Sequence, residues 1–324
     1  MKKIALAFSL MAAGLAFAAP ADAAGKYLLK VSNVLALEDP VNKGLEVFRD
    51  AVHKRTNGEV EIQIFPSSQL GADEDIIEQA RIGTNVGVVT DFGRISAYNK
   101  DFGIFAMPYL ITATDEIDKV LGTATYKDLV KKLEPQGLRP LSSNWFQGER
   151  HLFTKIPATK PADLKGVRIR TMGSPQAQAA MKCLGGIATT SPWSEAYQSL
   201  ENNVYDAVEV HYSAAIGASI AEVTKYIEKT GHFFLMTGLF ISQKWFATLP
   251  AGYQKILEEE AYNGAKHCTD LNIAKADEFE KQLVAQGLTV SQIDKQAFID
   301  ACKGTYKDLK YNELKDKIDK EIGR

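Results

Sequence analysis

Residues 163–171 read DLKGVRIRT, a short polar turn followed by a strand pattern. Because successive side chains of a strand face opposite sides, Val167 and Ile169 face one way while Arg168 and Arg170 face the other. The segment predicts a strand with one apolar face. Arg170 comes near the carboxyl end of this strand, which is the end at which open α/β sheets bind ligands.

Arg170 is therefore the first candidate ligand-binding residue. Its guanidinium is a planar fork that matches a carboxylate with two parallel hydrogen bonds and stays charged at any working pH. The alternative is structural, because most arginines of strands lie on the surface or pair with an acid of the protein.

The N-terminal half alternates strands with amphipathic helices, which favours parallel strands and an α/β fold. Strands are expected at Leu28–Ser32, Val60–Ile64 and Val86–Val89. The helices between them are expected from Val41 up to Asn57 and at Asp73–Ile82. Further strands are expected at Arg139–Ser143, His151–Thr154, Val167–Thr171 and Ala207–Val210, with a helix at Ser194–Asn202.

A long run rich in Ala, Glu, Lys and Leu extends from Leu249-Pro250 to Gln286-Gly287 and is interrupted only by Gly264. It predicts a long helix with a kink near Gly264. Roughly 300 mature residues exceed what one hydrophobic core usually serves, so two lobes are expected, bridged by this helix. In the absence of a Gly-, Pro- or Ser-rich linker, several strand crossings are expected to join the lobes.

The N-terminus reads as a secretory signal peptide, residues 1–23. Met1-Lys2-Lys3 precedes an apolar stretch that ends at Ala18, and cleavage is expected after Ala23, with Ala18 as the alternative. The apolar stretch is too short to span a bilayer. Removing it takes the net charge of −2 to about −3, which argues against nucleic acid or an anionic membrane as a partner. A periplasmic location is expected.

Signatures of catalysis and of metal binding are missing. The chain has no GxSxG, HExxH, phosphate-loop or GxGxxG motif, and its five histidines are scattered singly. We expect no cofactor, no metal and no enzymatic activity. Cys183, Cys268 and Cys302 have no CxxC spacing, so they are expected either as three buried thiols or with a Cys268–Cys302 bridge in the C-terminal helical region.

Several segments together resemble one family. Residues 164–170 (LKGVRIR), 193–201 (WSEAYQSLE) and 206–209 (DAVE), supported by 65–71 (FPSSQLG) and 105–110 (FAMPYL), are similar to the solute-binding subunits of tripartite ATP-independent periplasmic (TRAP) transporters. The resemblance covers essentially the whole mature chain, in order and with family-like spacing.

The resemblance implies roles for particular residues. Arg170 would form a salt bridge to the ligand carboxylate. Arg150 would be a second ligand arginine, unless it pairs with Glu149 or another acid. Trp193 would pack against the solute, unless it is an ordinary core residue. Asp73 and Asp91 would reach polar groups of the ligand, unless they cap helices.

One position departs from the family pattern. Many members have an asparagine followed by a proline after the residue that is Glu209 here, and this chain has Val210 and His211. The departure implies that a polar contact beside the carboxylate is lost. Together with six nearby aromatic residues it favours an aromatic or branched acid, or a keto acid, over a sugar acid; these residues are Trp145, Phe146, Trp193, Tyr212, Phe233 and Phe234.

The resemblance also implies architecture and function. Lobe I would comprise residues 24–147 and about 236–275, and lobe II residues 148–235 and about 276–324. A monomeric periplasmic receptor would bind a small carboxylate between the lobes and deliver it to a membrane permease. The alternatives are a ligand sensor for a signalling receptor, or an enzyme that uses His211 as a base beside Arg170.

Overall fold

The computed structural model describes residues 25–324, and the predicted signal peptide lies outside this range. Within it, nine strands form a single mixed sheet in the order β2-β1-β3-β8-β4-β7-β5-β6, with β9 paired to β8. Their bounds are β1 Tyr27–Ser32, β2 Val60–Phe65, β3 Val86–Asp91, β4 Leu138–Thr154, β5 Arg168–Thr171, β6 Ile187–Thr190, β7 Ala207–Val210, β8 Tyr226–Ser242 and β9 Thr289–Val290. The β1–β2, β1–β3, β5–β6 and β5–β7 pairs are parallel, as the alternating pattern predicts.

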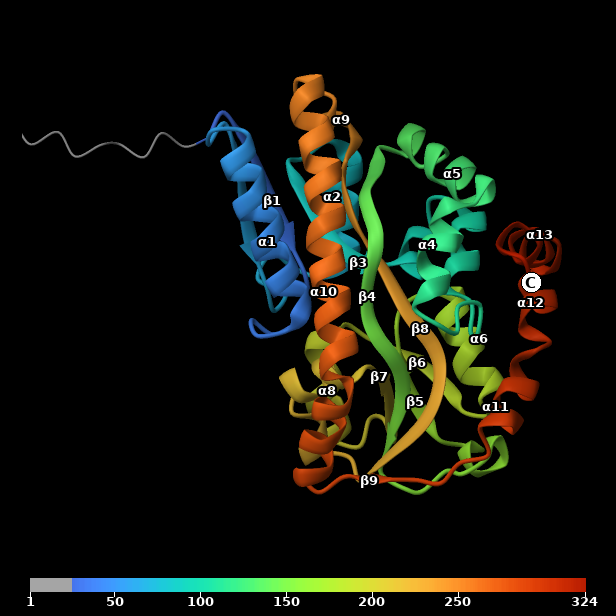
Figure 1. Ribbon diagram of the computed structural model, residues 1–324. Coiled ribbons are helices and arrows are strands. Elements are labelled where there is room, and N and C mark those ends of the chain that lie inside the picture. The colour runs from blue at the N-terminus through green and yellow to red at the C-terminus, as the bar shows by residue number, and fades with distance from the viewer. Residues whose placement is uncertain (1–24) are drawn as a thin grey trace, which may run out of the picture.

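Helices pack around this sheet on both sides (Figure 1). Their bounds are α1 Pro40–Arg55, α2 Asp73–Ile82, α3 Phe92–Ile95, α4 Asp115–Gly122, α5 Ala124–Lys131, α6 Pro175–Cys183, α7 Ala196–Glu201, α8 Tyr212–Gly217, α9 Gln243–Phe246, α10 Ala251–Ala285, α11 Lys295–Cys302, α12 Thr305–Asp308 and α13 Asn312–Ile322. For α2 and β7, the bounds predicted from the sequence are those of the structure. Of the helices described, α10 included, not one has a stretch long and apolar enough to cross a membrane.

Strands β4 and β8 join the two halves of the sheet. Each has 17 residues, and the two run antiparallel to one another through the middle of the molecule (Figure 1). At one end β8 pairs with β3, and at the other end β4 pairs with β7. The two short strands predicted at 139–143 and 151–154 are thus parts of one strand, and β8 is not predicted at all.

The long helix α10 lies against α1 and β4 and runs along both halves of the sheet (Figure 1). It is continuous through Gly264, where the sequence suggests an interruption. A β-carbon on Gly264 would lie 2.6 Å from the carbonyl oxygen of Gly44, and one on Gly44 would lie 2.5 Å from that of Gly264. Both glycines therefore serve the close approach of α1 to α10.

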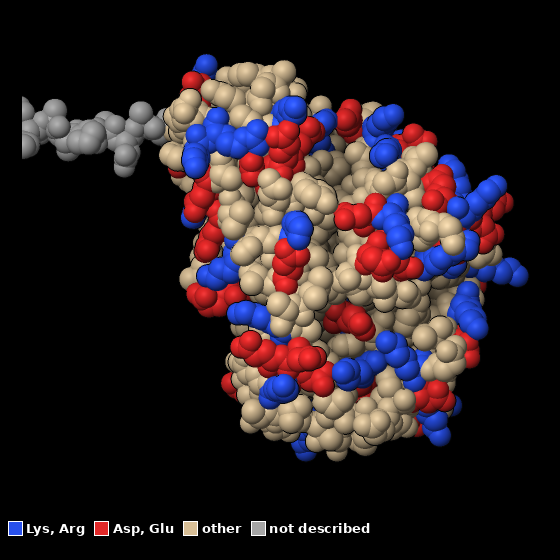
Figure 2. Space-filling view, viewed as in Figure 1, with Lys and Arg blue, Asp and Glu red and all other residues tan. Residues whose placement is uncertain are grey.

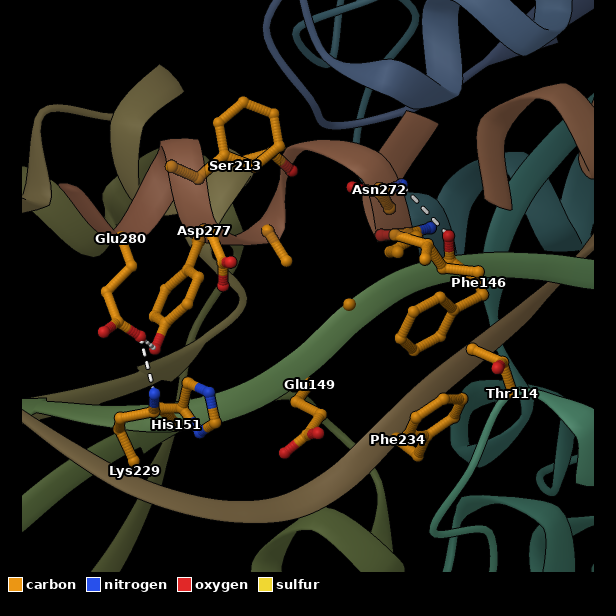
Figure 3. Close-up of a pocket in the computed structure, with 16 residues that line it drawn as sticks. Thr114, Phe146, Glu149, His151, Ser213, Lys229, Phe234, Asn272, Asp277 and Glu280 are labelled. Carbon is orange, nitrogen blue, oxygen red and sulfur yellow. Dashed lines mark hydrogen bonds and ion pairs between the residues drawn. The ribbon is translucent and has the colours of Figure 1, made fainter. Parts of the chain in front are cut away.

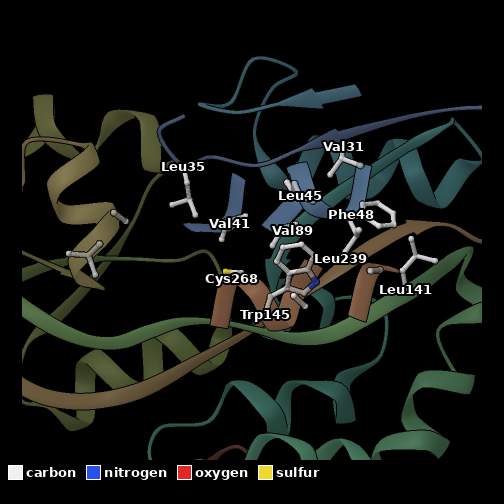
Figure 4. Packing of buried hydrophobic residues seen from close by; sticks show 14 of the residues in the cluster. Val31, Leu35, Val41, Leu45, Phe48, Val89, Leu141, Trp145, Leu239 and Cys268 are labelled. Carbon is white, nitrogen blue, oxygen red and sulfur yellow. The ribbon is translucent and has the colours of Figure 1, made fainter. Parts of the chain in front are cut away.

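The main hydrophobic core lies where α1 and α10 cover the sheet (Figure 4). Trp145 is fully buried there, beside Phe48 and Cys268, and its indole N–H donates to Ser142 Oγ over 2.8 Å. Two further clusters lie elsewhere: one packs α2 to α5 with α12 and α13, and the other packs β5 and α6 with α11. Trp145 is thus a core residue.

The cysteine pairing differs from both sequence-based expectations. Cys183 at the end of α6 forms a disulfide with Cys302 at the end of α11, with Cα atoms 4.8 Å apart. Cys268 is a buried free thiol in α10. The partners are 119 residues apart in sequence, and only the packing of α11 on α6 brings them together.

The C-terminal segment returns to the first half of the chain. The Glu321 carboxylate on α13 accepts hydrogen bonds from the backbone and hydroxyl of Thr125 on α5, and Arg324 pairs with Glu116 on α4 at 3.1 Å. We therefore propose that α12 and α13 belong with lobe I and that lobe II ends near Cys302. The other predicted boundaries stay predictions.

The disulfide predicts the number of reactive thiols. The purified mature chain, unfolded in denaturant without reductant, should react with a thiol reagent at one site, Cys268, and at three sites after reduction. Cys302→Ser should expose Cys183 as a second thiol and lower the free energy of unfolding by about 2–4 kcal/mol. Three reactive thiols in the unreduced chain would contradict the pairing.

Candidate functional site

One cavity gathers every ligand-binding residue predicted from the sequence. It measures about 50 Å³, and its lining includes Asp73, Asp91, Arg150, Arg170, Trp193, Val210 and His211. Its other lining residues are Val34, Leu35, Val89, Thr90, Arg94, Gln147, Met172, Ala214, Leu235 and Thr237.

The fold explains why residues so far apart in sequence meet here. Asp91 ends β3, Arg170 is the penultimate residue of β5 and Val210 ends β7, so the carboxyl ends of three strands contribute. Asp73 begins α2, and His211 precedes α8. Strand ends followed by helix starts are where α/β sheets place binding residues.

Arg170 is a buried cation without a counter-ion. Only 1% of it is exposed, one Nη atom donates to the Ser191 carbonyl over 2.7 Å, and Nε has no partner. The guanidinium lies 5.2 Å from the centre of the Trp193 ring, which favours a cation–π contact. Within residues 25–324 no carboxylate forms an ion pair with it.

Burial also lowers the pKa of Arg170. Removal from water lowers this pKa to about 10, with Glu209 opposing the change and Arg150 adding to it. The side chain stays charged at neutral pH, so the protein holds a desolvated positive charge at the cavity wall. Such a charge is costly unless an anion neutralises it.

Arg150 is already neutralised by the protein. Its Nε contacts a carboxylate oxygen of Glu209, and an Nη atom donates to the Glu209 carbonyl over 2.6 Å. Burial acts to raise the pKa of Glu209, but Arg150 and His232 outweigh it and lower that pKa to about 2. The ion-pair alternative for Arg150 is thus what the structure contains, with Glu209 as the acid and not Glu149.

Arg94 is a third cavity arginine, which the sequence analysis did not identify. It contacts the Asp91 carboxylate and lies 2.7 Å from Glu74 and 3.9 Å from Asp73. Burial disfavours its charge, but these acids outweigh burial and raise its pKa. The only feature of the sequence that could have indicated Arg94 is its position three residues after Asp91, which ends a strand.

The two aspartates have different partners. Asp91 caps α3 by accepting from the Arg94 backbone N–H over 3.1 Å, so the cap alternative holds for it. Asp73 does not cap α2, because Ala72 occupies the N-cap position. Its Oδ2 accepts from the Thr90 hydroxyl over 2.8 Å and its Oδ1 has no partner. Burial raises the pKa of Asp73 to about 6, against the effect of Arg94.

His211 supplies unsatisfied polar atoms to the cavity. It is 2% exposed, and neither ring nitrogen has a hydrogen-bond partner. Burial, with help from Arg150, lowers the pKa of His211 to about 3, so the ring is neutral and offers one donor and one acceptor. His211 therefore offers polar atoms beside the position at which the departure from the family pattern removes a polar side chain.

Most of the aromatic residues considered from the sequence lie elsewhere. Of the six, only Trp193 lines this cavity. Phe146, Tyr212 and Phe234 line a separate cavity of about 310 Å³ beside α10, where Tyr212 donates to Glu280 over 2.7 Å (Figure 3). This second cavity is a hollow with acidic side chains about it, on a face where positive and negative side chains are otherwise interspersed (Figure 2). The reasoning that favoured an aromatic acid thus loses most of its basis.

The fold and the cavity define a class of protein. A two-lobed α/β fold, crossed by paired strands and a long helix, encloses a small cavity lined by a guanidinium without an ion-pair partner among residues 25–324. Small-molecule sites lie preferentially between domains. Residues 31–313 match the model of the bacterial extracellular solute-binding proteins, family 7. The chain belongs to this family, as its resemblance to TRAP solute-binding subunits implies.

Known proteins of the same type align over most of the chain. The C4-dicarboxylate-binding periplasmic protein DctP of Rhodobacter capsulatus is 29% identical over 85% of this chain and 81% of its own. A TRAP periplasmic solute-binding protein from Desulfovibrio salexigens, in complex with diglycerolphosphate, is 31% identical. The match covers 92% of this chain and 96% of its own, with a TM-score of 0.87.

Two other solved structures bear on the state of the lobes. An apo open structure from Escherichia fergusonii is 38% identical, covers 91% of this chain and 99% of its own, and has a TM-score of 0.80. A structure from Ochrobacterium anthropi with bound L-fuconate is only 28% identical over the same shares of the chains, yet its TM-score is 0.88. The better match to the ligand-bound form, with the small cavity, indicates that the lobes are closed.

The buried pair of Arg150 and Glu209 predicts a stability effect. Arg150→Met should lower the free energy of unfolding at pH 7 by about 3–5 kcal/mol, because Glu209 is left buried without its cation. Adding Glu209→Gln should restore part of the loss. Arg168→Met, which breaks an ion pair whose arginine side chain is 44% exposed, should cost at most about 1 kcal/mol. Urea unfolding measures all three.

The same pair sets an acid dependence. Because the pKa of Glu209 is lowered from 4.5 to about 2, its stabilising contribution is complete above pH 4.5 and is lost as the pH falls toward 2. The Arg150→Met/Glu209→Gln variant should lack this contribution. Equal loss of stability in acid for wild type and variant would contradict the assignment.

Proposed function

We propose that the chain is a periplasmic receptor that binds a small organic carboxylate in the cavity and passes it to the permease of a TRAP transporter. The observation that carries the proposal is the buried, uncompensated guanidinium of Arg170. An anionic solute supplies the missing counter-charge and a bidentate acceptor for the guanidinium. The acid and phosphate ligands held by solved family members support an anion.

Each lining residue takes a role suited to its environment. Arg170 pairs with the carboxylate, and Trp193 packs against the solute beside it. His211 and Asp73 exchange hydrogen bonds with the polar groups of the solute. Arg150 and Asp91 hold their neighbours in place and border the solute, and Val210 provides an apolar wall.

Affinity must come from more than one contact. Micromolar binding corresponds to roughly −8 kcal/mol, whereas one charge-assisted hydrogen bond contributes about 1.5–3 kcal/mol. Closure of the lobes supplies the remainder by burying the solute between residues of both. We propose that the closed, loaded receptor is the form that a membrane permease recognises, and that it acts as a monomer.

The alternative of an enzyme that uses His211 as its base is disfavoured by the pKa of that residue. His211 would have to accept a proton from a bound acid, but burial lowers its pKa to about 3. A base with so low a pKa holds a proton weakly at neutral pH. Binding and release of an unchanged solute fit these residues better.

The proposal predicts the effect of removing Arg170. Arg170→Ala should weaken binding of the cognate acid by about 100-fold or more, because the carboxylate is then desolvated without its partner. Thermal unfolding measures this over a panel of mono- and dicarboxylates, keto acids, sugar acids, aromatic acids and glycerol phosphates. The ligand-induced shift follows RT ln(1 + [L]/Kd), about 4 kcal/mol at a thousandfold excess.

Arg168→Ala is the matched control. Arg168 lies on the same strand but pairs with Asp206 at the surface, so its removal should leave the ligand-induced shift unchanged. If an acid shifts wild type and Arg170→Ala equally, Arg170 is not the anchor. If no anion of the panel stabilises the wild type, and none copurifies with it, the proposed function fails.

A further inference from the structure

The start of α6 packs against segments that we assign to the other lobe. Helix α6 follows strand β5 of the second lobe, and it contacts α3, α12 and the short 3-10 helix η1 Lys100–Ala106. Helix α12 lies beside α6 (Figure 1). On the proposed boundaries all three segments belong with the first lobe, so this contact forms when the lobes close.

Gln176 on α6 makes hydrogen bonds across this contact. It is 2% exposed, its Nε2 donates to the Tyr311 hydroxyl over 2.9 Å, and its Oε1 accepts from the Ser96 hydroxyl over 3.3 Å. The Tyr311 hydroxyl donates in turn to the carbonyl of Lys100 over 2.6 Å, which leaves its oxygen free to accept from Gln176. Both ends of the amide are therefore hydrogen-bonded, which offsets the cost of removing it from water.

Two glycines make room for the start of α6. A β-carbon on Gly103 would lie 2.0 Å from Gln176 Nε2 and 2.6 Å from the Tyr311 hydroxyl oxygen. A β-carbon on Gly93 would lie 2.5 Å from Ser174 Oγ. Neither glycine has a positive φ, so these positions require the absence of a side chain and not a special backbone conformation. A larger residue at either position would displace the start of α6.

We propose that Gln176 is a latch of the closed receptor: it does not touch the solute, but its hydrogen bonds hold the lobes together and set the rate at which the solute leaves. Gln176 does not line the cavity, yet it follows Arg170 by six residues, and Met172 between them is a lining residue. Docking of Gln176 therefore also holds the strand end that carries Arg170 against the cavity. The inference rests on the proposed function and on the proposed lobe boundaries.

The first test removes the latch and leaves the cavity lining intact. The solute enters the open form, in which Gln176 does not reach the first lobe, so its loss should change release and not capture. Gln176→Ala should weaken binding about tenfold, with a dissociation rate about tenfold higher and an unchanged association rate. Gln178→Ala, the same chemical change at a partly exposed position of α6, should leave both rates unchanged.

The measurements use the mature chain and a defined set of anions. Calorimetric titration of the wild type with lactate, malate, 2-oxoglutarate, gluconate, benzoate and glycerol 3-phosphate selects the tightest binder as the probe. Stopped-flow mixing with this probe, followed by tryptophan fluorescence, gives the two rates for each variant. Thermal unfolding of the empty proteins shows whether a substitution damages the fold.

The second test fills the space that Gln176 occupies. Gly103→Ala should keep the loaded protein more open, with a larger radius of gyration in small-angle X-ray scattering and an affinity at least about tenfold lower. Adding Gln176→Ala removes the nearest clashing atom, so the second substitution should cost little further affinity. Gly304→Ala, whose β-carbon would meet nothing within 4 Å, should behave as the wild type.

The outcomes separate this inference from the proposed function. If Gln176→Ala keeps the wild-type dissociation rate while Arg170→Ala abolishes binding, the receptor stands and the latch is wrong. An equal rise of the dissociation rate in Gln178→Ala, or a lower unfolding temperature of empty Gln176→Ala, would point to general damage to α6 and would also overturn the latch. If no anion of the set binds the wild type, both fail.

Discussion

A guanidinium buried without a counter-ion is the constraint on which the rest of this structure depends. Taking a charge out of water costs several kcal/mol unless an opposite charge compensates it. Arg170 is held at this cost by the short parallel strands around β5, by the carbonyl of Ser191 and by the Trp193 ring. Burial lowers its pKa only to about 10, so the charge persists at neutral pH. The fold therefore keeps in place a charge that has no ion-pair partner among residues 25–324.

The neighbouring arginines show that the missing partner is particular to Arg170 and not a general feature of the cavity. The side chains of Arg94 and Arg150 are only 9% and 6% exposed, and each contacts a carboxylate of the protein. Their pairs also fix the backbone around the cavity, because Asp91 caps α3 and the carbonyl of Glu209 accepts from Arg150. Internal pairing thus provides rigidity, and on the proposed function the unpaired residue provides the site.

Local periodicity and family resemblance together predicted much of the fold. The seven residues that they indicate as a ligand site all line one cavity, and their role in binding stays a prediction. Helix α2 and strand β7 have clear patterns and were placed correctly. Strand β8 is buried along almost its whole length, so it lacks the alternation that marks a half-exposed strand. The Cys183–Cys302 bridge, the burial of Trp145 and the pairing of Arg94 with Asp91 all depend on tertiary contacts that no local pattern contains.

The same unsatisfied groups connect solute binding with closure. In the closed form, Gln176 on α6 contacts Tyr311 and Ser96, which we assign to the first lobe. Without a solute, this form would enclose the charge of Arg170 and the bare ring nitrogens of His211. Opening the cavity would let water reach these atoms and remove that cost. On the proposed function, the empty receptor is therefore biased toward the open form and the loaded one toward the closed form, so that the position of the lobes would report whether a solute is bound.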